Sequence, residues 1–139
     1  MKAISARITK GLLVGSNVVA ADNSGALIVR ITGVKRGKVG RGRQQYAKLG
    51  DWVKVSVKKG LPDMKGKVFD AVVVRQRMPF RRYTGERVAF TDNAVVLLKD
   101  EKGNPKGTQV KGPVAREIHE RWPGVSKIEI GRASCRERV

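Results

Sequence analysis

Apolar residues either alternate with polar ones or follow one another without interruption along most of the chain. Seven short segments show one of these two patterns, and most of them are rich in Val, Ile and Leu. A two-residue period and a continuous β-branched run are both typical of β-strands. The pattern therefore predicts strands over residues 4–9, 17–21, 26–34, 52–58, 68–75, 86–90 and 94–98.

Residues that favour turns separate these segments. Residues 22–25, Asp-Asn-Ser-Gly, predict a tight turn whose glycine takes a positive φ, and residues 83–85, Tyr-Thr-Gly, predict the tip of a hairpin. Residues 59–63 and 100–105 predict loops. Many short strands joined by such turns indicate a mainly β protein, either a closed barrel or a sandwich. The barrel is favoured because closure leaves no exposed sheet edge in a small domain.

One helix is predicted near the end of the chain, over residues 114–121. Pro113 suits the first turn of a helix, where its missing N–H is no loss, and Pro123 prevents the helix from continuing. Apolar residues recur at every fourth position and would form one stripe facing the core. They are Val114, Ile118 and Trp122.

Composition narrows the class of protein. The 139 residues fit one domain, and 30 Lys and Arg against 12 Asp and Glu give a formal charge of +18. No apolar run approaches the roughly 18 residues of a membrane-spanning helix, and the first residues lack a signal-peptide pattern. One cysteine and one histidine cannot build a zinc site. We expect a cytoplasmic protein with no cofactor, no metal and no membrane attachment, whose partner is a polyanion.

The charge is concentrated in residues 31–60, where nine basic residues face one acid. Within that block, residues 35–45 combine five cations with three glycines. Glycine lets a backbone approach a phosphate closely, and arginine can grip phosphate oxygens with two N–H groups. We therefore predict an RNA-binding loop, against the alternative of a solvated loop. Its cations are Lys35, Arg36, Lys38, Arg41 and Arg43.

A second basic segment, residues 75–83, leaves an apolar strand and enters the predicted hairpin. Its arginines would contact phosphates, while Phe80 and Tyr83 either stack on bases or pack under the hairpin. Lysines that alternate with apolar residues on neighbouring strands, including Lys58 and Lys59, are further candidates. The arginines predicted to bind RNA are Arg75, Arg77, Arg81 and Arg82.

Catalytic groups are scarce. His119 is the only histidine and is expected on the outer face of the predicted helix, and Cys135 lies near the end of the chain. No nucleophile with a nearby base can be assembled from them, so the protein is not expected to be an enzyme. The alternatives are a free nucleic-acid-binding barrel, an RNA-modifying enzyme and a protein attached to a membrane surface. The last two lack the acid–base groups and the amphipathic basic helix that they would need.

Several motifs in a fixed order resemble one family. Residues 21–26, 71–77 and 92–96 look like signature segments of the universal large-subunit ribosomal protein L-fourteen family. Three later motifs fit its archaeal and eukaryotic branch, the archaeal one better: residues 106–108, 112–114 and 121–123. The resemblance covers about residues 1–128. The turn residues Asp22, Asn23 and Gly25 match the family's signature turn, which we interpret as structural.

The resemblance implies a five-stranded closed β-barrel with hairpin extensions and a short C-terminal helical segment. It also implies a structural constituent of the large ribosomal subunit that binds large-subunit rRNA through basic loops. Such a protein would help to form an intersubunit bridge with small-subunit rRNA. Neighbouring ribosomal proteins, including the L-three type, and the anti-association initiation factor six would be further partners in the cytoplasmic ribosome.

One position and one segment depart from the family pattern. Thr84 precedes Gly85, where the family usually has Asp, Asn or Ser, and threonine can make a weaker form of the same turn bond. Residues 129–139 are polar and unlike the family. We therefore expect a single domain over residues 1–128, followed by a tail that is either disordered or a sequence artefact.

Overall fold

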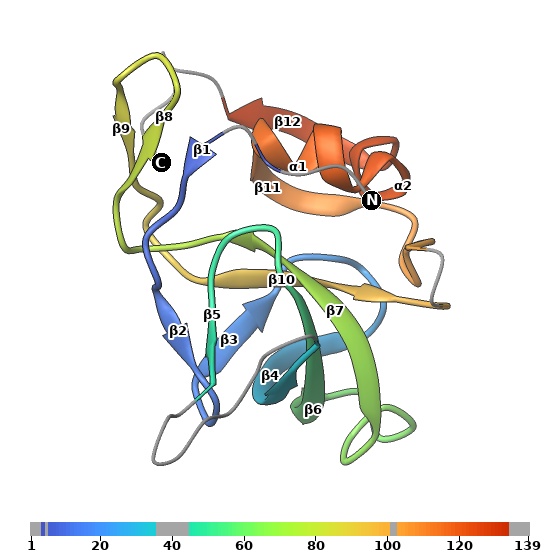
Figure 1. Cartoon of the computed structure of the whole chain (residues 1–139). Helices are drawn as coiled ribbons and strands as arrows, with labels where there is room; N and C mark the ends of the chain where they lie inside the picture. The colour runs from blue at the N-terminus through green and yellow to red at the C-terminus, as the bar shows by residue number, and fades with distance from the viewer. Residues whose placement is uncertain (1–3, 5, 36–44, 101–102, 134–139) are drawn as a thin grey trace.

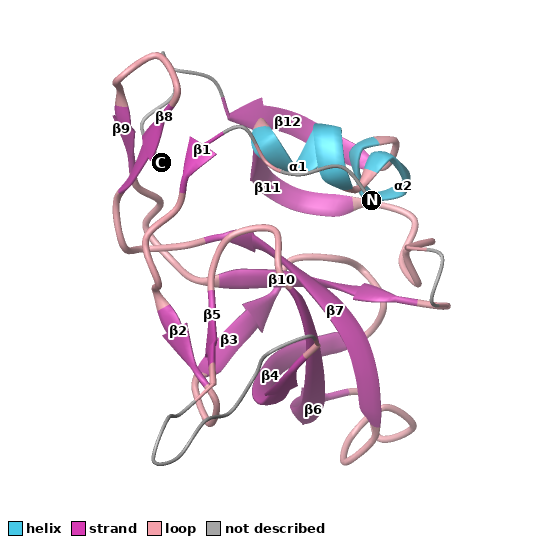
Figure 2. Ribbon diagram, in the orientation of Figure 1, coloured by secondary structure: helices cyan, strands magenta, loops and turns pink. Residues whose placement is uncertain are grey.

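The computed structural model describes residues 4, 6–35, 45–100 and 103–133, and only the backbone of 129–133 (Figures 1 and 2). Short strands dominate, and two short helices lie near the C-terminus. The elements are β1 (Ala6–Arg7), β2 (Leu12–Leu13), β3 (Asn17–Ala20), β4 (Ala26–Val34), β5 (Tyr46–Ala47), β6 (Trp52–Gly60), β7 (Val68–Arg75), β8 (Phe80–Arg82), β9 (Arg87–Val88), β10 (Ala94–Leu98), β11 (Val110–Ala115), α1 (Glu117–Arg121), α2 (Pro123–Ser126) and β12 (Glu129–Ala133).

Five strands form a closed barrel in the order β10-β3-β4-β6-β7, which confirms the predicted architecture. Four neighbouring pairs are antiparallel, and the barrel is closed by the parallel pair of β10 and β3. Buried residues alternate with exposed ones on β3 and through much of β4 and β6, as expected for strands with one face in solvent. The barrel interior is filled mainly by small and branched apolar side chains such as Val29, Ile31, Val55, Val73 and Leu97.

Strands β7 and β10 separate the barrel interior from a second core. Their sequences are the continuous apolar runs, and residues 71–75 and 94–98 are buried throughout. Alternate residues face opposite sides of a strand. Val73 and Leu97 therefore fill the barrel, while Val72 and Val96 pack into the second core. This second core lies between the barrel wall, the β8–β9 hairpin and the C-terminal elements (Figure 2).

The C-terminal layer consists of the parallel pair β11 and β12 with α1 and α2 (Figure 1). The prediction of a helix from residue 114 is wrong, because Val114 and Ala115 belong to strand β11, where they pair with β12. Pro113 accordingly lies in a strand. Trp122 has an extended φ of −128° and interrupts the helical segment, and α2 begins at Pro123. The predicted apolar stripe is nevertheless buried in the second core.

Strand β12 lies in the segment that the sequence suggested as a tail outside the domain. That segment therefore begins with five residues whose backbone forms a paired strand, 129–133. A parallel partner distant in sequence leaves no local signal, which is why the pattern analysis did not find this strand. Cys135 lies outside the described residues.

A small three-stranded sheet, in the order β1-β8-β9, carries the predicted hairpin. Its outer strands, β1 and β9, are shorter than the predicted 4–9 and 86–90. Thr9 and Phe90, which follow these two strands, form hydrogen bonds with Gln76 instead of with β8. The fully buried Gln76 side chain donates to the carbonyl of Thr9 at 2.9 Å and accepts from the N–H of Leu49 at 3.0 Å. The Gln76 backbone carbonyl accepts from the N–H of Phe90 at 3.1 Å.

Neither helix in the described part of the chain is long and apolar enough to cross a membrane. Among the same residues, no three His, Cys, Asp or Glu side chains gather where they could hold a metal ion.

Candidate nucleic-acid interface

The turn over residues 22–25 connects the barrel to the C-terminal layer. Asp22 is 3% exposed, and its carboxylate accepts from the Ser24 hydroxyl at 2.8 Å and from the Leu97 N–H at 3.1 Å. The Asn23 side-chain oxygen accepts from the backbone N–H groups of residues 108 and 109 at 2.8 and 3.2 Å. Gly25 takes a φ of 106°, which favours glycine. These contacts lie within the protein, so the turn positions its neighbours rather than presenting side chains to a ligand.

Burial raises the pKa of the Asp22 carboxyl above its ordinary value, despite its hydrogen bonds from Ser24 and Leu97. The pKa of Asp51 is raised for the same reason, against hydrogen bonding by Lys48 and the positive charges of Lys48 and Arg121. Both carboxylates form hydrogen bonds or ion pairs with other residues of the protein. Among the described residues, neither belongs to a group of three His, Cys, Asp or Glu side chains that could hold a metal ion.

The first basic segment is described only at its edges. Lys35 is half-buried, with its ammonium 3.5 Å from the centre of the Trp52 ring and 3.8 Å from Asp70. Its charge is thus partly engaged by the outer wall of the barrel. The other four cations predicted to bind RNA lie outside the described residues: Arg36, Lys38, Arg41 and Arg43.

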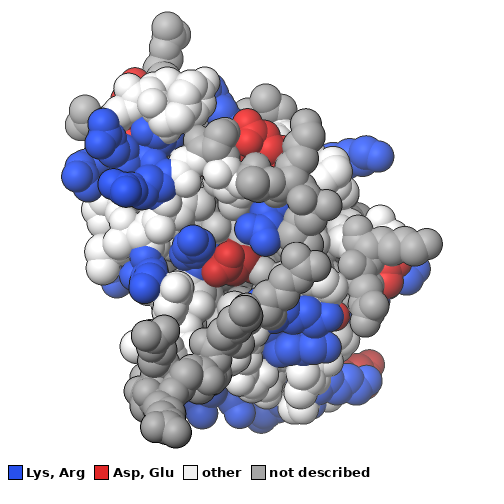
Figure 3. Space-filling model, in the orientation of Figure 1, with Lys and Arg blue, Asp and Glu red and all other residues white. Residues whose placement is uncertain are grey.

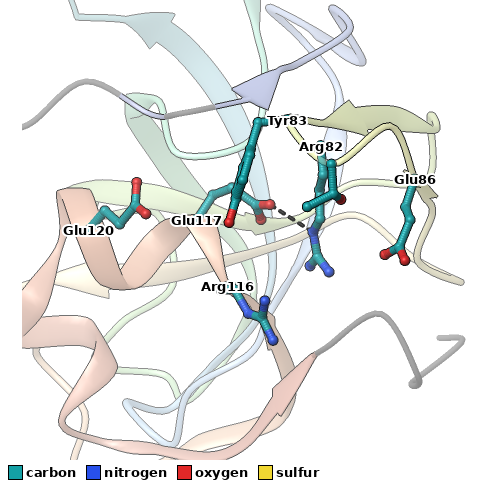
Figure 4. A pocket seen from close by; sticks show the side chains of 7 residues that line it. Arg82, Tyr83, Glu86, Arg116, Glu117 and Glu120 are labelled. Atoms are coloured by element: carbon teal, nitrogen blue, oxygen red, sulfur yellow. Dashed lines mark hydrogen bonds and ion pairs between the residues drawn. The ribbon is translucent and has the colours of Figure 1, made fainter.

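The four arginines of the second basic segment do not share one environment. Arg75 is 7% exposed, with its Nε 3.0 Å from Asp92 and its Nη1 donating to the carbonyl of Lys111 at 2.9 Å. Arg82 is 4% exposed, and its Nε donates to the carboxylate of Glu117 on α1 at 2.7 Å (Figure 4). Both side chains hold elements of the protein together, so we no longer count them among the RNA-contacting cations.

Arg77 and Arg81 alternate with these buried residues and are exposed. The two aromatic residues also separate. Phe80 is fully buried under the hairpin, whereas Tyr83 at the hairpin tip is 78% exposed. Lys58 and Lys59, at the end of β6, are exposed as well. Only some of the described cations that the sequence suggested are therefore exposed.

Two exposed arginines escaped the sequence analysis. Arg7 on β1 and Arg87 on β9 lie on either side of Arg81 in the small sheet. Figure 3 shows basic side chains gathered over β8 and β9, at the upper left of the molecule. Both residues lay in predicted strands, but only the pairing of those strands with β8 brings the three arginines together.

His119 lies on α1 and is half-buried, so it does not face outward as expected. The described residues around it include no cluster of three metal-ligating side chains. What the arrangement offers chemically is a rigid frame with exposed guanidinium and ammonium groups, which can bind phosphates through charge-assisted hydrogen bonds.

Comparison with known proteins agrees with the resemblance found in the sequence. Residues 11–129 match the model of the family described as ribosomal protein L14p/L23e. The large ribosomal subunit protein uL14 of Nanoarchaeum equitans is 51% identical over 128 residues, which cover 92% of this chain and 96% of that protein. The uL14 protein of Methanocorpusculum labreanum is 49% identical with the same coverage. That of Halobacterium salinarum is 50% identical over 122 residues, 88% of this chain and 92% of that protein. The chain thus belongs to the ribosomal protein L14p/L23e family.

Proposed function

We propose that this protein is a structural, non-enzymatic constituent of the large ribosomal subunit in the cytoplasm, where it binds large-subunit rRNA. The observation that carries the proposal is a charge of +18 on a protein whose relatives are named as large-subunit proteins. Phosphate contacts of exposed Arg and Lys supply most of the affinity in such a complex, and they position the protein without reading base sequence.

The proposed RNA-contacting residues fall into two groups. The described ones are exposed at the end of β6, in the connection from β7 to β8, and on β8: Lys58, Lys59, Arg77 and Arg81. The others come from residues 36–44, whose composition of arginine, lysine and glycine suits a phosphate backbone: Arg36, Lys38, Arg41 and Arg43. The same family membership supports the finer proposals of a bridge to small-subunit rRNA and of contacts with an L-three-type protein and initiation factor six.

A free nucleic-acid-binding barrel is the second candidate, and the aromatic residues argue against it. Such barrels stack bases on aromatic side chains that share one sheet face. Here Phe80, Phe90 and Trp122 are buried. The Trp52 and Trp122 rings pack edge to face with centroids 6.0 Å apart. Among the described aromatic residues, Tyr46 and Tyr83 are exposed, but Tyr46 lies on β5 and Tyr83 in the turn after β8, so they share no sheet face.

Sedimentation tests the proposal directly. The tagged full-length protein is expressed in its source cells, and lysates are separated on sucrose gradients at low salt. We expect the protein in the large-subunit and whole-ribosome fractions, and a dissociated subunit should release it as salt rises. A protein that stays at the top of the gradient at low salt would contradict the ribosomal role.

The cations of residues 36–44 can be tested by their effect on salt dependence. Arg41→Ala with Arg43→Ala should remove about two phosphate contacts. Log affinity for rRNA falls as log salt rises, and the loss should make this fall less steep by about 1.5. Filter binding from 50 to 200 mM salt measures this slope. Lys65→Ala with Lys67→Ala removes the same charge from an exposed site outside the proposed set and serves as the control. An unchanged slope in the first variant would remove these arginines from the interface.

A further inference from the structure

Three arginines form one row across the small sheet β1-β8-β9. Arg7 is the register partner of Arg81, and Arg81 is the partner of Arg87. Residues directly opposite one another in antiparallel strands project from the same face, so the three side chains stand next to each other. Strands lie about 4.8 Å apart, which makes the row about 10 Å long. All three residues are exposed, and we call them the arginine row.

The opposite face of the same sheet is fixed against the second core. Phe80 and Val88 are register partners and are buried there, and Arg82 is anchored by its ion pair with Glu117. A strand residue between two buried neighbours must point the other way. The direction of the arginine row is therefore determined by the packing beneath it, and the row is preorganised for a ligand.

The described residues supply no counterion for the row. No carboxylate in the described part of the chain forms an ion pair with Arg7, Arg81 or Arg87. Like charges directly opposite each other on a sheet are destabilising. Arg82 and Arg75, by contrast, each have a carboxylate partner. The row thus has an energetic cost in the free protein that a bound polyanion would relieve.

A groove and an aromatic side chain adjoin the row. The groove has a volume of about 560 Å³ and is lined by Ala6, Arg7, Arg81, Arg82 and Tyr83. Tyr83 is 78% exposed, the most exposed large apolar or aromatic side chain among the described residues. An exposed aromatic ring next to arginines offers a stacking surface beside phosphate-binding groups, the combination by which proteins hold unpaired nucleotides.

We propose that the arginine row and Tyr83 form a binding site for a single-stranded segment of RNA. Phosphates of neighbouring nucleotides lie on Arg7, Arg81 and Arg87, and an unpaired base stacks on Tyr83. The proposal rests on the proposed rRNA-binding function and adds two cations, the strandedness of the RNA and a stacking residue. An acidic protein segment would satisfy the arginines but need not carry a ring for Tyr83, whereas every nucleotide carries a planar base, so RNA is favoured.

Fluorescence anisotropy with a labelled, unstructured 12-nucleotide RNA tests the site in the full chain. We expect the variant with Arg7→Gln, Arg81→Gln and Arg87→Gln to bind at least about tenfold more weakly at 100 mM salt, with a salt slope smaller by about 2. The control variant, with Lys65→Gln, Lys67→Gln and Lys127→Gln, loses the same charge from exposed positions outside the row. Equal losses in the two variants would overturn the proposal.

Two further measurements separate the alternatives. Tyr83→Ala should weaken binding of the 12-nucleotide RNA about threefold or more and leave a duplex of the same length unaffected, and an equal effect on both would overturn the stacking role. Thermal unfolding without RNA should show a higher Tm for the row variant than for the wild type, and a lower Tm would contradict an uncompensated row. A glutamate oligomer that competes as well as RNA at equal charge would identify an acidic protein ligand instead.

The two proposals fail in different ways. If the ribosomal role is wrong, the wild-type protein does not sediment with the large subunit. If only the inference on the row is wrong, the wild type sediments with the subunit while the row variant binds the 12-nucleotide RNA as the lysine control does.

Discussion

The two cores of this protein are built differently. The barrel interior is lined by one closed sheet and contains mainly branched aliphatic side chains. The second core is assembled from the barrel wall, a hairpin and the C-terminal layer, and it includes the larger rings of Phe80, Phe90 and Trp122. A buried ion pair borders the second core, where Arg82 joins β8 to Glu117 on α1. The buried Arg75 side chain meets the partly exposed Asp92 carboxylate and the backbone of β11.

The difference shows what each kind of assembly requires. A closed sheet satisfies its own backbone hydrogen bonds, so alternating apolar residues are enough to fix which face is inside. Separate elements that meet at an interface need directional contacts to fix their relative placement. Two of the arginines that the sequence suggested as ligand-binding groups, Arg75 and Arg82, supply those contacts. Burial therefore divides the basic residues into those that hold elements of the protein together and the exposed ones that we propose to contact RNA.

Breaking the buried ion pair should have the largest effect on stability. Glu117→Ala leaves the Arg82 guanidinium buried without its carboxylate, and we expect a loss of about 3–5 kcal/mol in the free energy of unfolding. Urea denaturation followed by circular dichroism measures it. The double variant Arg82→Met with Glu117→Leu should recover most of the loss. A double variant that is as unstable as the single one would contradict this expectation. It would mean that the ion pair itself stabilises the contact between β8 and α1.

Cavities in the two cores provide the next comparison. Ile31 in the barrel and Ile118 in the second core are both fully buried, and each substitution by alanine should cost about 2–5 kcal/mol. Amide hydrogen exchange should separate them. Ile31→Ala should lower protection throughout the barrel, whereas Ile118→Ala should lower it first in β11 and α1. Uniform loss of protection in both variants would show that the two cores unfold as one unit.

The contribution of Asp22 to the free energy of unfolding should depend on pH, because burial raises the pKa of its carboxyl group. A raised folded-state pKa means that the folded protein holds this proton more tightly than the unfolded chain. Its contribution to stability is complete below the ordinary value of 3.8 and is lost as pH rises through the raised pKa. The stability advantage of the wild type over Asp22→Asn should therefore shrink from pH 3.5 to pH 7 in urea titrations. An advantage that stays constant or grows over this range would contradict a raised pKa at Asp22.

The smallest effect is expected where a basic residue has no internal role. Arg77→Gln, two residues after the buried Arg75, should change the free energy of unfolding by no more than about 0.5 kcal/mol. Arg75→Gln should be clearly more destabilising, because it removes the contacts with Asp92 and with the carbonyl of Lys111. Parallel urea titrations of the two variants make the test, and equal effects would contradict the division of roles.

Much of the fold could be predicted from local patterns. Alternation identified β3, β4 and β6, and the continuous apolar runs of β7 and β10 marked strands that are buried on both faces. Interactions between distant residues could not be predicted in this way. Glu117 lies 35 residues after its partner Arg82, and nothing near Arg82 distinguishes it from Arg81. The strand at Val114 likewise depends on β12, and the arginine row depends on the pairing of three short strands.

The parallel pair that closes the barrel has a consequence during synthesis. Strand β3 ends at residue 20, and its partner β10 begins only at residue 94. Until the ribosome has released that later segment, the nascent chain carries an open edge and many unneutralised cations. Folding that waits for such a distant partner is slow, and an incomplete sheet invites aggregation. A newly made copy is therefore most prone to aggregation while the last barrel strand is still inside the exit tunnel.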